Sequence, residues 1–313
     1  MSSPLSRRLF VASASAALAS AQERVTQPAV SEEACPLEVV APAALDGYLG
    51  QAVLRKPPGP GPFPAILWIH GGLTKIPVTA LQNIARTGPN PLRFLAAGYV
   101  VIVPTYRSRD VDPQSRVSLE DCLGAVKHLR SLRYVDAKSI VPIGCSGGGD
   151  LALEIAAATD VCAIIAEEPA SLLMAGILNT KSPKQGERYS PRDASPILEN
   201  PKEFYTPEYQ KLLRAKISRI QRPILIIQGD DERRGPSVNH FNEQVLVPEL
   251  RGAGKSLEVK TYPGEQHCFC MIGRESRPGN VLKAFRDMDG FCRRHIATKP
   301  KPLDSGLVKQ VEL

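Results

Sequence analysis

The sequence predicts an α/β protein with a mostly parallel central sheet and helices on both faces. Two features of the 313 residues predict this class. Short apolar runs typical of buried strands recur along the chain, and segments with the periodicity of amphipathic helices lie between them. Because 43% of the residues are hydrophobic, one sizeable core is expected, and we place a single domain at residues 37–297.

The expected strands share a run of apolar, often β-branched residues that ends at a turn signal. They lie at residues 37–40, 48–54, 65–69, 99–103, 140–143, 163–166, 224–227 and 257–262. The first two flank the turn signal Asp46-Gly47 and could pair as an antiparallel entry to the sheet. Helical periodicity occurs at residues 119–132, 148–158, 208–217 and 281–296. This alternation favours parallel strands joined by helices.

The N-terminus has the composition of an export signal. Arg7 and Arg8 precede a mildly apolar stretch at residues 11–19 and a small-x-small cleavage site that ends at Ala21. An Arg pair with Phe two positions on resembles a twin-arginine signal, although ordinary secretory signals also begin with basic residues. The stretch is shorter than the roughly 20 apolar residues of a membrane span. We expect residues 1–21 to be a signal peptide, a periplasmic or extracellular mature chain and no stable membrane insertion.

Charge, cysteine content and residue spacing limit the kinds of partner, disulfide and cofactor to expect. The formal net charge is +7, but basic residues are largely spread among acids and do not interleave with aromatic residues, so we expect no nucleic acid partner. Seven cysteines cannot all pair within one chain, so at least one is free or pairs with another molecule. No group of His, Cys, Asp or Glu has metal-ligand spacing, and we expect neither a metal nor another cofactor.

The segment Gly-Cys-Ser-Gly-Gly is the strongest functional signal. It places Ser146 between the strand at residues 140–143 and the helix at residues 148–158. This is the context of a nucleophile elbow, in which a strained turn lifts the serine hydroxyl out of the sheet toward a helix N-terminus. We therefore predict Ser146 as a nucleophile rather than as part of an incidental glycine turn.

A serine nucleophile needs a base and an acid that orients the base. Of the three histidines that follow Ser146, His267 lies in a loop directly after a strand, whereas His240 and His295 fall in helical segments. We predict His267 as the base. The acid is expected after the strand at residues 224–227, where three acidic residues stand in a row.

The oxyanion that forms during attack needs two hydrogen-bond donors. Gly147, directly after the nucleophile, supplies one backbone N–H. The loop after His70 offers the other through Gly71 or Gly72, although a His-Gly-Gly segment could also serve only to turn the chain.

Taken together, these motifs resemble those of the α/β-hydrolase superfamily. Within it, the chain is similar to the dienelactone-hydrolase-like enzymes and to the catalytic domain of prolyl-oligopeptidase-type peptidases. The resemblance covers roughly residues 37–296 and rests on residues 70–72, 104–108, 134–136, 144–148, 228–232 and 262–267. It implies an α/β-hydrolase fold and supports both oxyanion donors.

The resemblance also bears on the acid. In such families the acid usually stands three residues after the glycine of the segment at residues 228–232, and this position holds Glu232. Most members carry aspartate there. This departure keeps Asp231 as the alternative to Glu232, which we favour because the longer glutamate can serve the same role.

Several segments lie outside these motifs. Residues 171–222 carry five prolines and are too long for a simple connection, so we interpret them as a cap over the active site; the alternative is an excursion packed at the sheet edge. Residues 298–313 are polar and Lys-rich, and we expect a mobile tail.

Some polar residues near the motifs have two interpretations. Glu167 and Glu168 end a strand at the active-site edge and could bind a cationic group, but we interpret them as solvated loop carboxylates. Arg107 could meet an anionic substrate or make a structural ion pair. We interpret Cys145 as a packing residue.

These residues predict a carboxylic ester hydrolase. Ser146 would attack an acyl carbonyl, His267 would take its proton, and water would later cleave the acyl-enzyme. The expected partner is a small ester or short peptide. One alternative is a serine peptidase of prolyl-oligopeptidase type, although the chain has no N-terminal propeller to select peptides. The other is a non-catalytic binding protein on a hydrolase scaffold.

Overall fold

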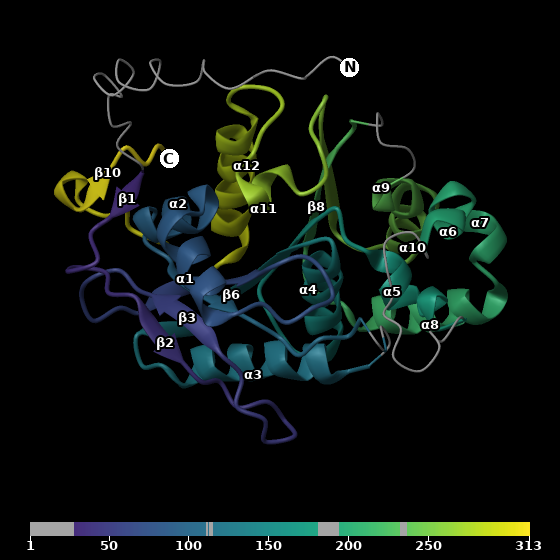
Figure 1. Cartoon of the computed structure of the whole chain (residues 1–313), viewed down its shortest axis with the longest axis horizontal. Helices are drawn as coiled ribbons and strands as arrows, with labels where there is room; N and C mark the ends of the chain where they lie inside the picture. The colour runs from purple at the N-terminus through teal and green to yellow at the C-terminus, as the bar shows by residue number, and fades with distance from the viewer. Residues whose placement is uncertain (1–27, 111, 113–114, 181–193, 232–236) are drawn as a thin grey trace, which may run out of the picture.

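The computed structural model of the chain describes residues 28–110, 112, 115–180, 194–231 and 237–313. One large sheet crosses this part of the chain, with helices packed on both of its faces (Figure 1). Its strands run in the order β2-β3-β5-β4-β6-β7-β8-β9. The pairs β2/β3 and β3/β5 are antiparallel and all other pairs are parallel. The predicted α/β fold with an antiparallel entry is confirmed.

The strands lie close to their expected positions. They are β2 (Glu38–Val40), β3 (Ala52–Arg55), β4 (Phe63–Ile69), β5 (Val100–Pro104), β6 (Val135–Cys145), β7 (Ile164–Glu167), β8 (Ile224–Gly229) and β9 (Leu257–Tyr262), with β1 (Ala29–Val30) and β10 (Val308–Lys309) in a second, two-stranded sheet. The helices are α1 (Val78–Thr87), α2 (Pro89–Ala96), α3 (Val117–Ser131), α4 (Gly147–Ala158), α5 (Ser171–Ala175), α6 (Ser195–Glu199), α7 (Pro201–Phe204), α8 (Pro207–Arg219), α9 (Val238–Phe241), α10 (Val247–Gly252), α11 (Phe269–Ile272) and α12 (Asn280–His295), with short turns of other helical type at Ile177–Thr180, Asn242–Leu246 and Ser305–Leu307.

Two hydrophobic cores cover the two faces of the sheet. Strand β4 contributes to both, because Leu67 and Ile69 enter the core with α3 and α4, whereas Ile66 and Trp68 enter the core with α1, α2 and α12. This alternation follows from the two-residue period of a strand. It explains why the central strands read as continuous apolar runs. Among the described residues, no helix is long and apolar enough to cross a bilayer.

The C-terminal residues, expected as a mobile tail, make defined contacts. Strand β10 pairs with β1 in antiparallel register, and the Leu303 N–H donates to the Ala96 carbonyl at 2.8 Å. Leu303, Val308 and Val311 pack against the core that includes α2 and α12. Although the segment is polar on average, these apolar residues are spaced so that they can pack against the core and hold the segment in place.

The described part of the insertion between β7 and β8 is helical. Helix α8 packs against α4, and α6 and α7 contact the segment that follows β8 (Figure 1). Residues 181–193, in the middle of the expected cap, lie outside the described residues. The cap over the active site therefore remains a prediction.

Candidate active site

The chain turns sharply at Ser146, between the end of β6 and the start of α4. The backbone angles of Ser146 are φ 53° and ψ −118°, a conformation that non-glycine residues rarely adopt. A side chain at Gly144 would overlap the Gly148 carbonyl, so this close turn requires glycine. The Ser146 N–H donates to the Glu167 carbonyl at 2.9 Å, which ties the turn to the end of β7. This is the geometry of a nucleophile elbow.

The glycine loop after β4 lies against this elbow. A methyl group added at Gly71 would lie 3.7 Å from Ser146 Cβ, and one added at Gly147 would overlap the Gly72 carbonyl oxygen. Gly147 is also the first residue of α4, so its N–H has no partner in the hydrogen-bond ladder of that helix. The two backbone segments predicted to bind an oxyanion are therefore brought together beside Ser146.

A buried tyrosine holds the glycine loop. The Tyr106 hydroxyl lies 3.1 Å from the His70 carbonyl and 2.9 Å from the Gly72 carbonyl, and its ring stacks on the His70 ring at 4.2 Å. Nδ1 of His70 donates to the Gly71 carbonyl at 2.8 Å. Burial lowers the pKa of His70 to about 4, although the hydrogen bond to Gly71 opposes this. The His70 ring is therefore neutral near pH 7 and serves as a packing surface for Tyr106.

Arg109 connects the same two segments from the other side. Its Nη2 donates to the Gly147 carbonyl at 2.9 Å and pairs with Asp150 Oδ2 at 3.0 Å, and its backbone N–H donates to the Leu73 carbonyl at 2.7 Å. Both charged side chains of the pair are buried. One residue thus bonds to both the glycine loop and the first turn of α4.

The predicted base contacts a glutamate at the end of β7. His267 lies in the loop between β9 and α11, and its Nδ1 is 2.6 Å from Glu168 Oε2. The Glu168 side chain is 1% exposed, whereas the His267 side chain is 44% exposed. Because it is buried and paired, Glu168 is not the solvated loop carboxylate that the sequence suggested.

Three further donors converge on the Glu168 carboxyl group. Oε2 accepts the Cys268 N–H at 2.6 Å, and Oε1 accepts the Gly229 N–H at 2.8 Å and the Asn239 side-chain amide at 2.9 Å. Such bonds compensate for the hydration that a carboxylate loses on burial. Glu168 is therefore held in one orientation while it contacts His267.

Glu167 is also buried, and its side chain binds the backbone of the segment that follows His267. Its carboxyl oxygens accept the N–H groups of Cys270 at 2.7 Å and Met271 at 3.0 Å. Burial and the neighbouring charge of Glu168 raise the pKa of Glu167 to about 8. The interpretation of Glu167 as a solvated carboxylate is wrong for the same reason as for Glu168.

Glu168 also changes the proton affinity of His267. Burial lowers the pKa of His267, but the hydrogen bond and charge of Glu168, together with the charge of Glu167, raise it above its usual value. With Nδ1 engaged by Glu168, Nε2 is the ring nitrogen that can exchange a proton with a substrate or nucleophile.

Of the two acids favoured by the sequence, only Asp231 is among the residues that the structure describes. Glu232 falls in residues 232–236, outside the described residues. Asp231 is partly buried, its backbone N–H donates to the Glu265 carbonyl at 3.0 Å, and it lines a cavity beside His267. The signal that could have found Glu168 was its place at the carboxyl end of a predicted parallel strand, where site residues gather.

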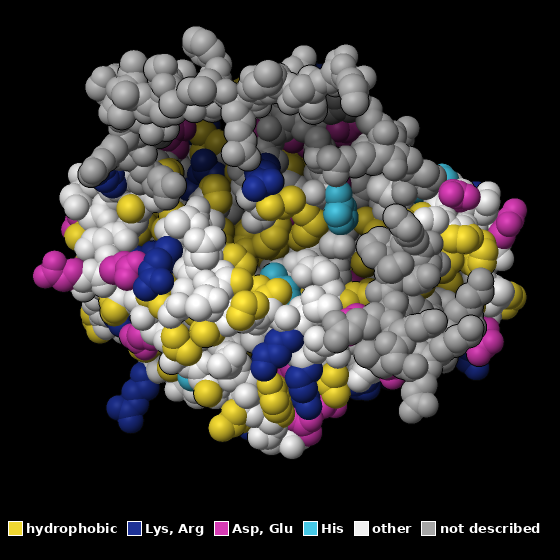
Figure 2. Space-filling model, in the orientation of Figure 1, with side chains coloured by type: hydrophobic (Ala, Val, Ile, Leu, Met, Phe, Trp, Pro, Cys, Tyr) yellow, Lys and Arg dark blue, Asp and Glu magenta, His cyan; other side chains and the backbone are white. Residues whose placement is uncertain are grey.

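A cavity of about 550 Å³ lies beside His267 and Glu168. Its described lining is mostly polar and comprises Glu168, Gly229, Asp230, Asp231, Ser237, Asn239, His240, Glu243, Glu265, Gln266, His267, Ile272 and Arg274. No described residue of the insertion at residues 171–222 lines it. In Figure 2, hydrophobic side chains and histidines border a depression near the centre of the visible face. The volume is in the range of small-molecule sites.

Two cysteines join the elbow to the histidine loop. Cys145, directly before Ser146, forms a disulfide with Cys268, directly after His267. The interpretation of Cys145 as a packing residue is therefore wrong. Glu168, His267 and Cys268 also lie close enough together to share a metal ion, but the Cys268 sulfur is bonded to Cys145 and His267 Nδ1 to Glu168. These contacts leave the group poorly suited to a metal.

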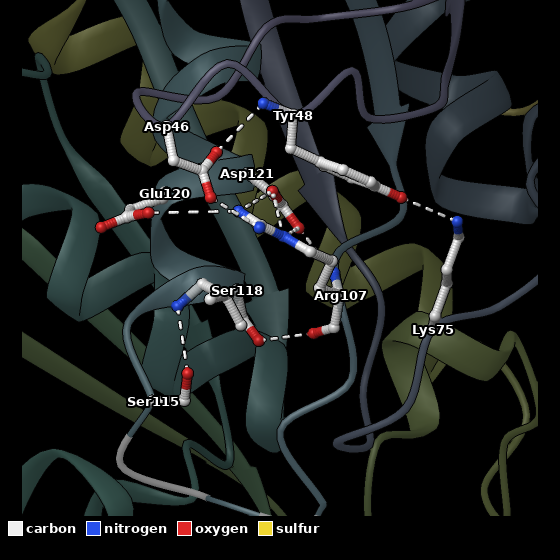
Figure 3. A network of polar contacts seen from close by, with 9 residues as sticks. Asp46, Tyr48, Lys75, Arg107, Ser115, Ser118, Glu120 and Asp121 are labelled. Atoms are coloured by element: carbon white, nitrogen blue, oxygen red, sulfur yellow. Dashed lines mark hydrogen bonds and ion pairs between the residues drawn. The ribbon is translucent and has the colours of Figure 1, made fainter.

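Arg107 belongs to a structural network rather than to the site (Figure 3). Its guanidinium pairs with Asp121 at 2.9 Å and Asp46 at 2.6 Å, and its backbone N–H donates to Asp121 Oδ2 at 2.6 Å. Ser118 Oγ donates to the Arg107 carbonyl at 2.7 Å. The network ties the segment after β5 to α3 and to the turn between β2 and β3, which favours the structural ion pair among the two interpretations.

The fold and these motifs agree with what is known of related proteins. Residues 112–299, more than half of the chain, match the model of the prolyl oligopeptidase family. The chain belongs to the prolyl oligopeptidase family. The fold described above agrees with this membership, and the resemblance to the α/β-hydrolase superfamily is confirmed.

Individual relatives are distant. Over 256 residues the chain is 24% identical to acylamino-acid-releasing enzyme 2 of Oryza sativa subsp. japonica, a match that covers 75% of this chain and 30% of that enzyme. The esterase Est22 has a similar structure, with a TM-score of 0.60, 17% identity and coverage of 84% of this chain and 82% of that one. A puromycin-hydrolyzing peptidase of Mycobacterium tuberculosis gives a TM-score of 0.62 at 18% identity, over 86% of this chain and 41% of that one. These structural similarities support the fold.

Proposed function

We propose that this chain is a carboxylic ester hydrolase with Ser146 as nucleophile, His267 as base and Glu168 as the acid that orients it. The observation that carries the proposal is the 2.6 Å contact between His267 Nδ1 and Glu168 Oε2, in a loop covalently joined to the elbow. Nδ1 has a single proton to donate, and Glu168 already receives it. Glu168 thus takes the role for which the sequence favoured Glu232 or Asp231.

The proposed reaction has two halves. Ser146 Oγ attacks the acyl carbonyl while its proton passes to His267 Nε2, and the N–H of Gly147 with that of Gly71 or Gly72 receives the developing oxyanion. His267 then protonates the departing alcohol. In the second half His267 takes a proton from water, which cleaves the acyl-enzyme. Glu168 stabilises the imidazolium in both halves without itself being protonated.

Ester and peptide substrates share this chemistry, so the choice depends on what binds beside the site. Structural similarity to an esterase over most of both chains and the small-molecule size of the cavity support a small ester. A serine peptidase is the second candidate, supported by membership of the prolyl oligopeptidase family and by similarity to an acylamino-acid-releasing enzyme.

The direct test compares the mature chain with Ser146→Ala on two substrate series, p-nitrophenyl esters of short and medium acids and aminoacyl p-nitroanilides. We expect ester turnover that the substitution abolishes. Anilide turnover abolished by the same substitution would favour the peptidase. Absence of turnover in both series, together with no adduct with a fluorophosphonate, would contradict a catalytic role. A non-catalytic binding protein on a hydrolase scaffold would then be the better account.

We also propose that the chain is exported after removal of residues 1–21. A disulfide within the domain supports this, because such bonds persist in oxidising compartments. Mass spectrometry of the protein from a periplasmic or culture fraction should give a mature chain that begins at Gln22. A full-length chain confined to the cytoplasm would contradict export.

A further inference from the structure

The disulfide between Cys145 and Cys268 lies at an unusual place in the molecule. It joins the residue before Ser146 to the residue after His267, across 123 positions of sequence and with 5.9 Å between the two Cα atoms. All seven cysteines are in the described residues, and the remaining five are free and buried. The one bridge among them therefore connects the immediate neighbours of the two residues between which a proton must move in the proposed reaction.

The backbone is strained at one end of the bridge, Cys268, and at the residue next to the other end, Ser146. Ser146 has φ 53° and Cys268 has φ 62°. Of the four non-glycine residues with positive φ in the described part of the chain, three lie at this site, Glu168 being the third. Such conformations are unfavourable and persist only where their surroundings fix them. The bridge is a covalent constraint on Cys268 itself and, through Cys145, on the adjacent Ser146.

The other attachments of the histidine loop are non-covalent and depend on two adjacent buried carboxyl groups. Glu168 accepts the Cys268 N–H, and Glu167 accepts the N–H groups of Cys270 and Met271. Burial, and after it the neighbouring charge of Glu168, raises the pKa of Glu167, so the protonation of this carboxyl group depends on pH. The bridge holds the loop by a means that does not depend on their protonation.

We propose that the Cys145–Cys268 bridge is a positioning element of the hydrolase: it holds His267 at the distance from Ser146 and Glu168 that proton transfer requires. This inference rests on the proposed function. Neither sulfur takes part in the chemistry. Reduction of the bridge frees the loop at Cys268 and lowers turnover while substrate binding, which uses other groups, changes less.

The bridge is protected from exchange within the chain. Cys270 lies two residues from Cys268, but burial and the charge of Glu167 raise its pKa well above the usual value. Because thiolates rather than thiols attack disulfides, Cys270 is a poor nucleophile. Opening the bridge therefore requires an external reductant, such as a phosphine.

The test uses the whole mature protein in two redox states. A water-soluble phosphine reduces the bridge to two thiols and becomes a phosphine oxide with oxygen from water; oxidised glutathione re-forms the bridge and leaves two molecules of reduced glutathione. We expect kcat for the best p-nitrophenyl ester to fall about 10- to 100-fold on reduction, with a smaller change in KM, and to recover on reoxidation. Alkylation and mass measurement should show two newly accessible thiols in the reduced protein.

A pH profile separates positioning from simple stabilisation. Glu168 raises the pKa of His267, so loosening this contact should move the acidic limb of kcat/KM to lower pH in the reduced enzyme. The double variant Cys145→Ala/Cys268→Ala should match the reduced wild type and be insensitive to phosphine. Cys292→Ala, a free buried cysteine in α12, should keep both the activity and the phosphine sensitivity of the wild type.

The inference is overturned if the fully reduced wild type keeps its kcat, KM and pH profile and loses only thermal stability. This comparison needs no substitution, so it holds even if the double variant does not fold. Failure of the proposed function gives a different result: the oxidised wild type would neither hydrolyse the esters nor form a fluorophosphonate adduct at Ser146.

Discussion

The carboxyl group of Glu168 connects segments that are far apart in the sequence. Glu168 is the residue directly after β7. Its carboxyl group contacts His267 and accepts the backbone N–H of Cys268, which lies a hundred positions further along the chain. It also accepts donors from Gly229 at the end of β8 and from Asn239 in α9. A side chain with these partners can orient the histidine and also holds together the loops around it.

We predict that Glu168→Gln lowers kcat/KM at least about 1,000-fold, because the amide can place a donor opposite the Nδ1 proton and cannot stabilise the imidazolium. Steady-state kinetics on the best ester would measure this. The matched control is Asp231→Asn, which removes the neighbouring cavity carboxylate and should stay within a few-fold of wild type. The opposite ranking of the two variants would assign the acid to Asp231, and a large loss in Glu232→Gln alone would assign it to Glu232.

The pH dependence of activity should be set by His267 and the two glutamates near it. In the proposed reaction His267 must be neutral to accept the serine proton, so kcat/KM should rise as pH passes through its pKa. Glu168 and Glu167 raise this pKa, and the acidic limb should therefore lie above the usual value of 6.5. In Glu168→Gln we expect the limb to move to lower pH. An acidic limb at the same pH in both proteins would argue against this contact.

At the scale of elements, the site is assembled where loops from β4, β6, β7 and β9 meet at one edge of the sheet. Parallel strands bring their carboxyl ends to the same edge, so residues that are distant in sequence become neighbours. Tyr106, at the end of β5, bonds to the β4 loop, and Arg109 links that loop to α4. These two residues hold the segments that carry the predicted oxyanion donors.

We predict that Tyr106→Phe lowers kcat about tenfold. The substitution removes the hydroxyl that bonds to the His70 and Gly72 carbonyls, so the N–H groups of the glycine loop should shift. Its free energy of unfolding should fall by about 1 kcal/mol. Tyr99→Phe is the control, since the buried Tyr99 bonds to Asp289 at 2.8 Å on the other face of the sheet. It should lose similar stability and keep its kcat. Equal kinetic effects of the two substitutions would show that Tyr106 acts on stability alone.

At the scale of the whole molecule, two cores hold the sheet between helical layers, and the C-terminal segment packs on one of them. The stability of this assembly should depend on pH through its buried acids. Glu167 has a pKa of about 8 in the folded chain, above the 4.5 of an exposed glutamate. Between these values the folded chain retains a proton that the unfolded chain releases.

The sign of the effect follows from this difference. Because the folded state binds more protons, the free energy of unfolding falls as pH rises from about 4.5 to about 8, by at most about 1.4 kcal/mol per pH unit for this group. Glu167→Gln cannot titrate, so its stability should depend less on pH over this range. Urea unfolding of both proteins at several pH values measures the difference. Parallel stability curves for the two proteins would refute the assignment to Glu167.

The amino-acid sequence by itself determined the fold class, the strand positions, the nucleophile elbow and the histidine loop. These features are local: a buried parallel strand, a Gly-x-Ser-x-Gly turn and a loop after a strand are each recognisable within about ten residues. Helices α1 and α2 were not predicted, because Gly88 and two prolines interrupt their periodicity. Pro89 in fact begins α2, at a position that needs no N–H donor.

Only the tertiary structure decided which groups meet. The contact of Glu168 with His267 and the bridge between Cys145 and Cys268 join residues about a hundred or more positions apart, and no local pattern encodes such pairings. The same holds for Glu167: its charge suggests a solvated loop, but in the fold it is buried and accepts the backbone N–H groups of Cys270 and Met271. The physical reason is that solvation and pairing depend on what surrounds a side chain, and those surroundings come from the packing of distant segments.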